Sequence, residues 1–138
     1  MSQPQICVGT DIVYIPRIQS AFEQFGDRFL ARVYTPSEQQ IFHQRRATAH
    51  HPRQRWHSSI VYLAGRWAAK EAIVKAMGTG WQGIRYTDIS IESYASGAPS
   101  VAIVNKSETW AFKPGQWQLS LSHDGDYAIA TALWHSHD

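Results

Sequence analysis

The chain has 138 residues, and 13 lysines and arginines set against 11 aspartates and glutamates leave a formal net charge of only +2. That charge is too small to indicate a polyanionic partner, and the single cysteine, Cys7, excludes an internal disulfide framework and a cysteine-rich zinc site. The length suits one domain over residues 1–138 with a sizeable core. We expect no secretory leader and no membrane span, since no apolar stretch approaches the roughly 18 residues needed to cross a bilayer, and therefore a soluble, cytoplasmic protein.

The first predicted element is a short buried strand over residues 6–13, which read Ile-Cys-Val-Gly-Thr-Asp-Ile-Val. It carries one acid, Asp11, at a place where an unpaired charge would be costly. We therefore expect Asp11 to have a partner of opposite charge or a bound cation.

Three helical segments are predicted next. An amphipathic helix begins near Pro16 and ends at Gly26, and residues 28–33 form a further short helical turn. The amphipathic helix that begins near Pro16 has apolar residues at helical spacing: Ile18, Ala21, Phe22 and Phe25. The run Thr35-Pro36-Ser37-Glu38 is a capping box with proline at the first helical position, which opens a helix through residues 41 and 42.

A basic segment separates this helix from the next one. Between Glu38 and Glu71 there is no acid, and Pro52 with its polar neighbours predicts a solvated surface loop over residues 43–58. The basic residues are His43, Arg45, Arg46, His50, His51, Arg53, Arg55, His57 and Arg66. They could contact phosphate or an acidic protein. A metal site is disfavoured, because the histidines form no repeated i, i+4 pair on a secure helix and no acid joins them.

A long helix is predicted from about Ser59 to Met77, where alanines are abundant and Gly78 can take the left-handed conformation that ends it. It carries a row of charges that we expect to be exposed: Arg66, Lys70, Glu71 and Lys75. Glu71 and Lys75 share one face, where an ion pair would stabilise the helix by about 0.2–0.5 kcal/mol. Two interpretations fit this row of charges: the charged side chains stabilise the helix, or they contact a charged ligand.

The second half of the chain changes to the period of strands. Ile89 and Ile91 alternate with polar residues, as do Val101 and Ile103, and the turn residues 96–99 between them predict a hairpin. Further strands are predicted over residues 116–122 and 127–134, with residues 135–138 as a frayed tail. The predicted fold class is α+β.

Motifs along nearly the whole chain match one enzyme family in that family's order. The most specific lies between residues 67 and 80, with Trp-Ala-Ala-Lys-Glu-Ala, Lys75 and Gly-Thr-Gly. The others are Gly9 to Val13 with Ile15 and Arg17, Arg28-Phe29, Arg32-Val33 with Thr35 and Glu38, and Ser120-Leu121-Ser122-His123 with Tyr127, Ala128 and Ala130. Together they resemble the holo-acyl-carrier-protein synthases, the short type of 4'-phosphopantetheinyl transferase.

The resemblance implies a fold, an assembly and a reaction. The implied fold has a long central helix packed on a small, mostly antiparallel sheet, and the implied assembly is a homotrimer with active sites between subunits. The reaction transfers the phosphopantetheine arm of coenzyme A to a serine of apo acyl carrier protein and releases adenosine 3',5'-bisphosphate, a step of fatty acid and lipid biosynthesis. Phosphoryl transfer of this kind requires charge neutralisation, to which Mg²⁺ is suited.

The resemblance also implies roles for single residues. Asp11 and Glu71 match the metal-ligand positions, and a divalent cation between them makes two neighbouring carboxylates tolerable. Glu71 and Lys75 would be the catalytic pair, with Lys75 facing the diphosphate. Contacts with coenzyme A would come from Arg66, Lys75, Gly78 and His123. The base that removes the serine proton is left open between Glu71, a bound water and the substrate phosphate.

The acidic carrier protein would meet arginines beside the active site. The matching positions are Arg17 and Arg28, with Arg32 as an addition, and their role would be electrostatic steering. The segment 43–58 is longer and more basic than the family pattern. The alternative interpretation is a small basic phosphate- or nucleic-acid-binding module, which would leave Asp11 and Glu71 unexplained.

Overall fold

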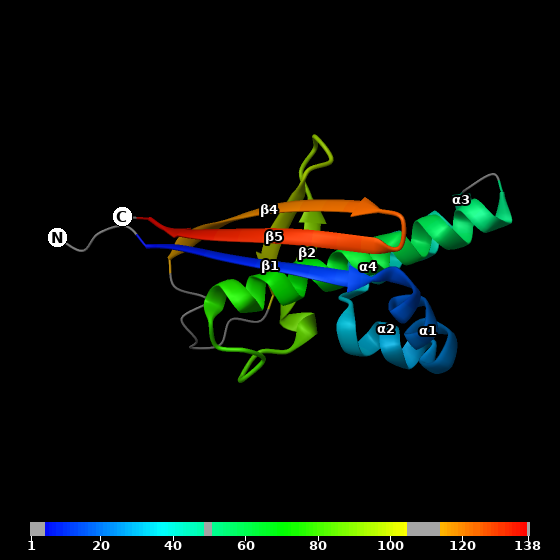
Figure 1. Ribbon diagram of the computed structural model, residues 1–138, viewed down its shortest axis with the longest axis horizontal. Helices are drawn as coiled ribbons and strands as arrows, with labels where there is room; N and C mark the ends of the chain where they lie inside the picture. Colours follow the sequence, from blue (N-terminus) through cyan, green and yellow to red (C-terminus); the bar gives the residue numbers. More distant parts are fainter. Residues whose placement is uncertain (1–4, 49–50, 105–113, 138) are drawn as a thin grey trace.

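The computed structural model describes residues 5–48, 51–104 and 114–137. Within them the chain forms two antiparallel sheets and four α-helices around a common core (Figure 1). In order, the elements are β1 (Ile6–Tyr14), α1 (Ile15–Phe25), α2 (Asp27–Val33), α3 (Pro36–Thr48), α4 (Pro52–Met77), the 3₁₀ helix η1 (Tyr86–Asp88), β2 (Ile89–Ser93), β3 (Pro99–Ile103), β4 (Gly115–Asp124) and β5 (Tyr127–Ser136). The predicted α+β class is confirmed.

The larger sheet has the strand order β1-β5-β4, and β2 pairs with β3 in the predicted hairpin. Helix α4 lies along the larger sheet and contacts all three of its strands, while α1 and α2 lie beyond one end of the sheet (Figure 1). None of the helices within the described residues is both long enough and apolar enough to cross a membrane.

Small residues allow α4 to approach the sheet closely. The facing residues are Ala68, Ala69, Ala72 and Ala76 on α4 and Ala128, Ala130 and Ala132 on β5, all of them buried. Gly9 of β1 lies so near the helix that a Cβ atom there would overlap the carbonyl oxygen of Ala72 and come within 2.5 Å of Ala76 N. This contact fixes how β1 sits beside α4.

The amino-terminal half confirms most of the predicted boundaries. Helix α1 has Pro16 in its first turn and is followed by Gly26, whose φ of 55° only glycine adopts readily. The capping box of α3 is present, since Thr35 N donates to Glu38 Oε1 at 2.8 Å and Glu38 N donates to Thr35 Oγ1 at 3.4 Å. Helix α4 ends at Gly78, which has a left-handed φ of 75°.

The loop conformation predicted for residues 43–58 is wrong, although most of the described residues in this segment are solvent-exposed, as expected. Residues 43–48 belong to α3 and residues 52–58 to α4, whose first turn is stabilised by a proline and by His51, whose Nδ1 accepts from Arg53 N at 3.2 Å. Arg46 lies 5.3 Å from the centre of the Trp56 ring and 5.5 Å from that of Phe22. Arginine is a good helix former, and here its guanidinium packs on aromatic rings, so basic composition did not mean a solvated loop.

Two strand predictions also need correction. The first strand is buried on one face only, and Ile6, Val8 and Ile12 on its other face are 64–69% exposed. The predicted tail over residues 135–138 does not begin at His135, because β5 continues to Ser136, whose N–H donates to Gln5 O at 3.0 Å.

Candidate functional site

Three charged side chains predicted to act together meet between β1 and α4. Asp11 lies on the inner face of β1 with a side chain only 16% exposed, and Lys75 Nζ donates to its Oδ1 at 3.0 Å. Burial raises the pKa of Asp11 above its ordinary value, the ion pair with Lys75 opposes this, and the nearby Glu71 carboxylate raises that pKa further. The ionised form of Asp11 is therefore disfavoured, chiefly by burial, and Lys75 offsets only part of this effect.

Aromatic donors hold the Glu71 carboxylate at both oxygens. Tyr86 O–H donates to Glu71 Oε1 at 2.6 Å, and Trp81 Nε1–H donates to Oε2 at 3.3 Å. Burial raises the pKa of the Tyr86 phenol, and the adjoining carboxylate raises it further, so the hydroxyl stays protonated and donates. Sequence reasoning missed both residues, because they follow the long helix in an irregular segment without periodicity. The one signal was a pair of aromatic residues on either side of Gly83, just after the Gly-Thr-Gly run.

The donor set fits a magnesium ion that is shared with a substrate. Among the described residues there is no cluster of three or more histidine, cysteine, aspartate and glutamate side chains that could enclose a metal. Magnesium, however, is commonly held by one or two carboxylates together with waters and substrate phosphates. Asp11 and Glu71 are hard oxygen donors, and the Glu71 carboxylate lies near enough to disfavour the ionised form of Asp11.

Lys70 does not belong to the exposed charged row that the sequence predicts. Its side chain is fully buried, with Nζ at 2.7 Å from Glu38 Oε1, 2.6 Å from Val33 O and 3.0 Å from Tyr86 O. Glu38 is equally buried, and its Oε2 also accepts from Ile91 N at 2.7 Å. This ion pair ties α2, α3, α4, η1 and β2 together, so Lys70 is structural and is not a ligand-facing cation.

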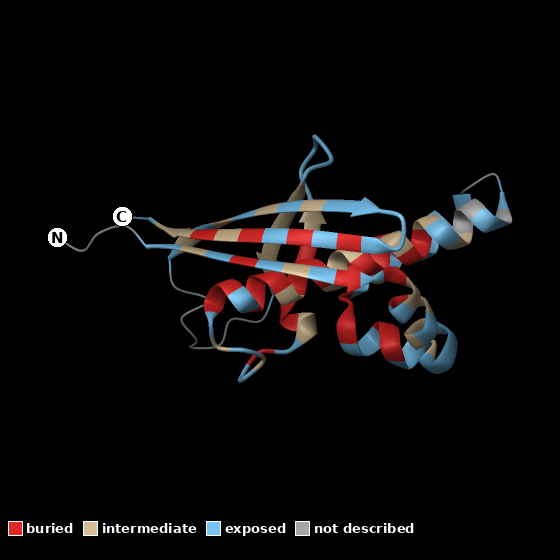
Figure 2. Cartoon of the chain, in the orientation of Figure 1, coloured by how far each residue is buried: buried red, intermediate tan, exposed pale blue. Residues whose placement is uncertain are grey.

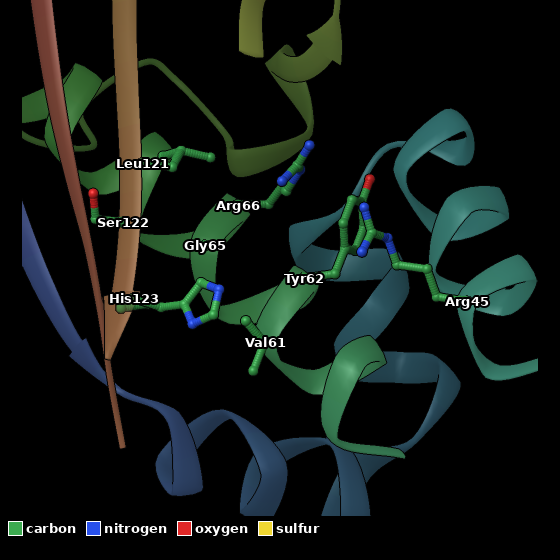
Figure 3. Close-up of a pocket in the computed structure, with 9 residues that line it drawn as sticks. Arg45, Val61, Tyr62, Gly65, Arg66, Leu121, Ser122 and His123 are labelled. Carbon is green, nitrogen blue, oxygen red and sulfur yellow. The ribbon is translucent and has the colours of Figure 1, made fainter. Parts of the chain in front are cut away.

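A separate cavity, of about 190 Å³ and lined by cationic side chains, lies on the β4 side of α4 (Figure 3). Arg66 and His123, both predicted coenzyme ligands, line it together with Arg45 and Tyr62. The guanidinium of Arg66 lies 4.2 Å from the centre of the Tyr62 ring and that of Arg45 lies 5.0 Å from it, and burial raises the pKa of Tyr62 to about 12. Two guanidiniums and an imidazole around one cavity suit a phosphate group.

The two groups lie on different sides of α4. Arg66 and Glu71 are five residues apart on the helix, which turns them about 140° from one another. Asp11 is on β1 and His123 on β4, and these strands flank β5. Gly78 follows Lys75 at the end of α4 with open space around its Cα, so the structure brings it close to Lys75 but into neither group.

A groove of about 390 Å³ lies between α1, α2 and α4. Arg28 and Arg32 are exposed at its margin, and apolar side chains that include Phe29 and Trp67 line it. Arg17, the third predicted carrier contact, is exposed on α1 but does not line the groove. The structure therefore brings two of the three arginines to one apolar groove.

Comparisons with known proteins agree on one family. Residues 7–132 match the family model described as the 4'-phosphopantetheinyl transferase superfamily. A protein named holo-[acyl-carrier-protein] synthase from Gloeobacter violaceus is 45% identical over 126 residues, which cover 90% of this chain and 88% of that protein. A protein of the same name from Protochlamydia amoebophila is 42% identical over 130 residues, covering 94% and 97% of the two chains.

Solved structures give the same result for the fold. The acyl carrier protein synthase of Plasmodium yoelii with ADP bound superposes with a TM-score of 0.80 at 28% identity, covering 99% of this chain and 100% of that one. The holo-[acyl-carrier-protein] synthase of Helicobacter pylori in complex with coenzyme A gives a TM-score of 0.73 at 28% identity, with 91% and 96% covered.

Proposed function

The chain belongs to the 4'-phosphopantetheinyl transferase superfamily, and from that premise we propose that it transfers the 4'-phosphopantetheine group of coenzyme A to a serine of apo acyl carrier protein. The products are holo carrier protein and adenosine 3',5'-bisphosphate. The observation that carries the proposal is the meeting of Asp11, Glu71 and Lys75 beside Gly9 in a chain 45% identical to a named synthase. The alternative of a basic phosphate- or nucleic-acid-binding module finds no support, because the family model and the named relatives are all phosphopantetheinyl transferases or holo-[acyl-carrier-protein] synthases.

The reaction is proposed to depend on magnesium held by Asp11 and Glu71. Support comes from the chemistry of the two side chains, because Asp11 and Glu71 are neighbouring hard-oxygen donors and the Glu71 carboxylate disfavours ionised Asp11. A magnesium ion bound there would neutralise charge on the diphosphate oxygens of coenzyme A during transfer.

Lys75 is proposed to act on the same diphosphate. Its side chain is 56% exposed, so it can turn from Asp11 toward a bound phosphate without disturbing the core. An ammonium group there would stabilise the phosphate oxygens or donate a proton to the leaving group. Glu71 and Lys75 are thus the proposed catalytic pair.

Arg66 and His123 are proposed to bind a different phosphate of coenzyme A. They lie across α4 from the carboxylates, so one coenzyme molecule would reach both groups most simply if they came from two subunits. This separation supports a homotrimer with active sites between subunits, in which Gly78 shapes the helix end beside Lys75.

The outer face of the larger sheet supports the same assembly. Ile6, Val8 and Ile12 are exposed on β1, and on β5 the exposed Ile129 pairs with Ile12, with the exposed Tyr127 two residues before it. Exposed residues alternate with buried ones along these two strands (Figure 2). Soluble monomers rarely leave apolar patches of this kind uncovered. We assign this face, the outer sheet face, to contact between subunits.

The carrier protein is proposed to dock at the groove between α1, α2 and α4. An apolar floor with arginines at the margin suits an acidic partner that buries a few apolar side chains. Arg28 and Arg32 would steer the partner, and Arg17 would extend the positive surface along α1. We place this reaction in the cytoplasm, within lipid biosynthesis, and treat residues 1–138 as one transferase domain.

Intact-mass spectrometry tests the proposed function directly. The purified chain is incubated with coenzyme A, Mg²⁺ and an apo acyl carrier protein, and the carrier is expected to gain the mass of one phosphopantetheine. A carrier whose acceptor serine is replaced by alanine is the matched control and should gain nothing. Absence of any gain on the unaltered carrier would contradict the transferase proposal, whereas full transfer in excess chelator would contradict only the magnesium proposal.

A further inference from the structure

Tyr86 occupies a special place beside the proposed metal site, because it is fixed at three points. Its hydroxyl donates to Glu71 at 2.6 Å, which is a short charge-assisted hydrogen bond. Its carbonyl oxygen accepts from the buried Lys70 at 3.0 Å. Its ring lies between those of Trp67, at 5.0 Å between centroids, and Trp81, at 3.9 Å.

Because Tyr86 is fixed, its hydroxyl restrains the side chain of Glu71. Glutamate has three rotatable side-chain torsions, and at a helix surface facing solvent these would leave the carboxylate free to turn. Tyr86 restrains one oxygen and Trp81 the other. Each carboxylate oxygen has about two lone-pair positions, so both oxygens keep one free for a cation.

The buried ion pair supplies the rigidity behind this arrangement. Lys70 is held by Glu38, which is itself held by Thr35 N and Ile91 N, and every one of these contacts is buried. The η1 turn that carries Tyr86 is closed by the Asp88 carboxylate, which accepts from Arg85 N at 2.9 Å. Tyr86 is thus attached to the rigid core on one side and to Glu71 on the other.

We propose that Tyr86, with Trp81 as the weaker partner, is a positioning residue that orients the Glu71 carboxylate toward Asp11 for binding Mg²⁺. This inference rests on the proposed magnesium site. Neither residue touches the phosphate or the ion; they act through Glu71, as outer hydrogen-bond partners of metal ligands commonly do. Removing the Tyr86 hydroxyl should therefore weaken Mg²⁺ binding by about 10- to 100-fold.

The test titrates Mg²⁺ by calorimetry into protein saturated with coenzyme A, in the absence of carrier protein so that no turnover occurs. Tyr86→Phe keeps the ring stack and removes only the hydroxyl, and Trp81→Phe should weaken Mg²⁺ binding by less, since its hydrogen bond is longer. The matched control is Tyr94→Phe, which removes the hydroxyl of an exposed tyrosine in the turn between β2 and β3. It should leave the Mg²⁺ dissociation constant within about twofold of the unmodified protein.

A double-mutant cycle then separates positioning from a general structural effect. In a Glu71→Gln background, Tyr86→Phe should cause little additional loss of Mg²⁺ affinity, because its effect passes through Glu71. Equal Mg²⁺ affinity in the unmodified protein and Tyr86→Phe would overturn the positioning role while leaving the metal site intact. Failure of the unmodified protein to bind Mg²⁺ with coenzyme A would overturn both.

Discussion

The site depends on a single residue without a side chain. Gly9 lies two residues before Asp11, and any Cβ there would strike the backbone of α4 at Ala72 and Ala76. A bulkier residue would push β1 away from the helix and carry Asp11 away from Lys75 and Glu71. At the residue scale, then, the carboxylate site is created by close backbone packing as much as by the charged side chains.

Asp11 is predicted to serve function at the expense of stability. Its pKa is raised by burial, so the ionised carboxylate is disfavoured in the folded state, and Asp11→Asn should raise thermal stability at neutral pH. The cost of burying ionised Asp11 applies at pH values above the pKa of Asp11 in the folded protein, and it disappears as the carboxyl protonates. The difference in melting temperature between Asp11→Asn and the unmodified protein should therefore shrink as the pH falls toward the ordinary pKa of 3.8.

If Asp11 holds the proposed Mg²⁺, the same substitution should lower the rate of phosphopantetheine transfer by about 100-fold or more, since a bound metal would supply several kcal/mol of charge stabilisation. Calorimetric melting from pH 7 to pH 4.5 and the intact-mass assay measure the two effects. Lower stability than the unmodified protein at pH 7, or transfer within a few-fold of it, would contradict this account of Asp11.

At the scale of elements, the sequence predicted features that depend on neighbouring residues and missed features that depend on residues far along the chain. Helix starts and ends depend on neighbours, so the capping box at Thr35 and the left-handed Gly78 were predictable. The burial of Lys70 depends on Glu38, 32 residues away, and no local sequence pattern indicates such a pair. The helical course of residues 43–48 and 52–58 was missed for a similar reason, because the rings that receive Arg46 come from three different helices.

The candidate site divides in the same way. The resemblance supplied Asp11, Glu71 and Lys75, and their meeting is confirmed for Asp11 and Lys75 by a 3.0 Å ion pair. Tyr86 and Trp81 could not be found, because their role exists only once the segment after α4 folds back onto Glu71. Contacts between distant segments are thus the part of the site that one sequence leaves undetermined.

The groove between α1, α2 and α4 yields a prediction about the carrier protein. The double replacement Arg28→Glu and Arg32→Glu should raise the KM for an acidic carrier by about tenfold or more and reduce its dependence on salt, since charges at the margin of an interface govern encounter. The dissociation constant for coenzyme A should change little. Arg53→Glu, at an exposed arginine in the first turn of α4, is the matched control for the change of charge. If the control raised the KM as much as the double replacement, the docking face would lie elsewhere.

At the scale of the whole molecule, the chain has an inner and an outer sheet face with different consequences. The inner face is filled by α4 and carries Asp11 at one edge and His123 at the other. The outer sheet face presents isoleucine, valine and tyrosine, and none of the helices or strands that the structure describes covers it (Figure 2). A monomer would expose this apolar surface and keep the carboxylate site apart from the cationic cavity of Arg66 and His123, and assembly through the outer sheet face would change both.

Charged residues placed on the outer sheet face should therefore dissociate the assembly and, with it, weaken coenzyme A binding. The unmodified chain is expected to sediment at three times its 15.6 kDa mass, whereas the double replacement Val8→Lys and Ile12→Lys should sediment as a monomer, because buried lysines at the interface would lose hydration without partners. Coenzyme A affinity should fall with dissociation, since Arg66 and His123 of one subunit would no longer face the carboxylates of another.

Tyr94→Lys, at an exposed tyrosine in the turn between β2 and β3, controls for adding a lysine to an apolar surface and should remain trimeric. A double variant that stays trimeric, or a monomer that binds coenzyme A with unchanged affinity, would show that the outer sheet face does not build the active site.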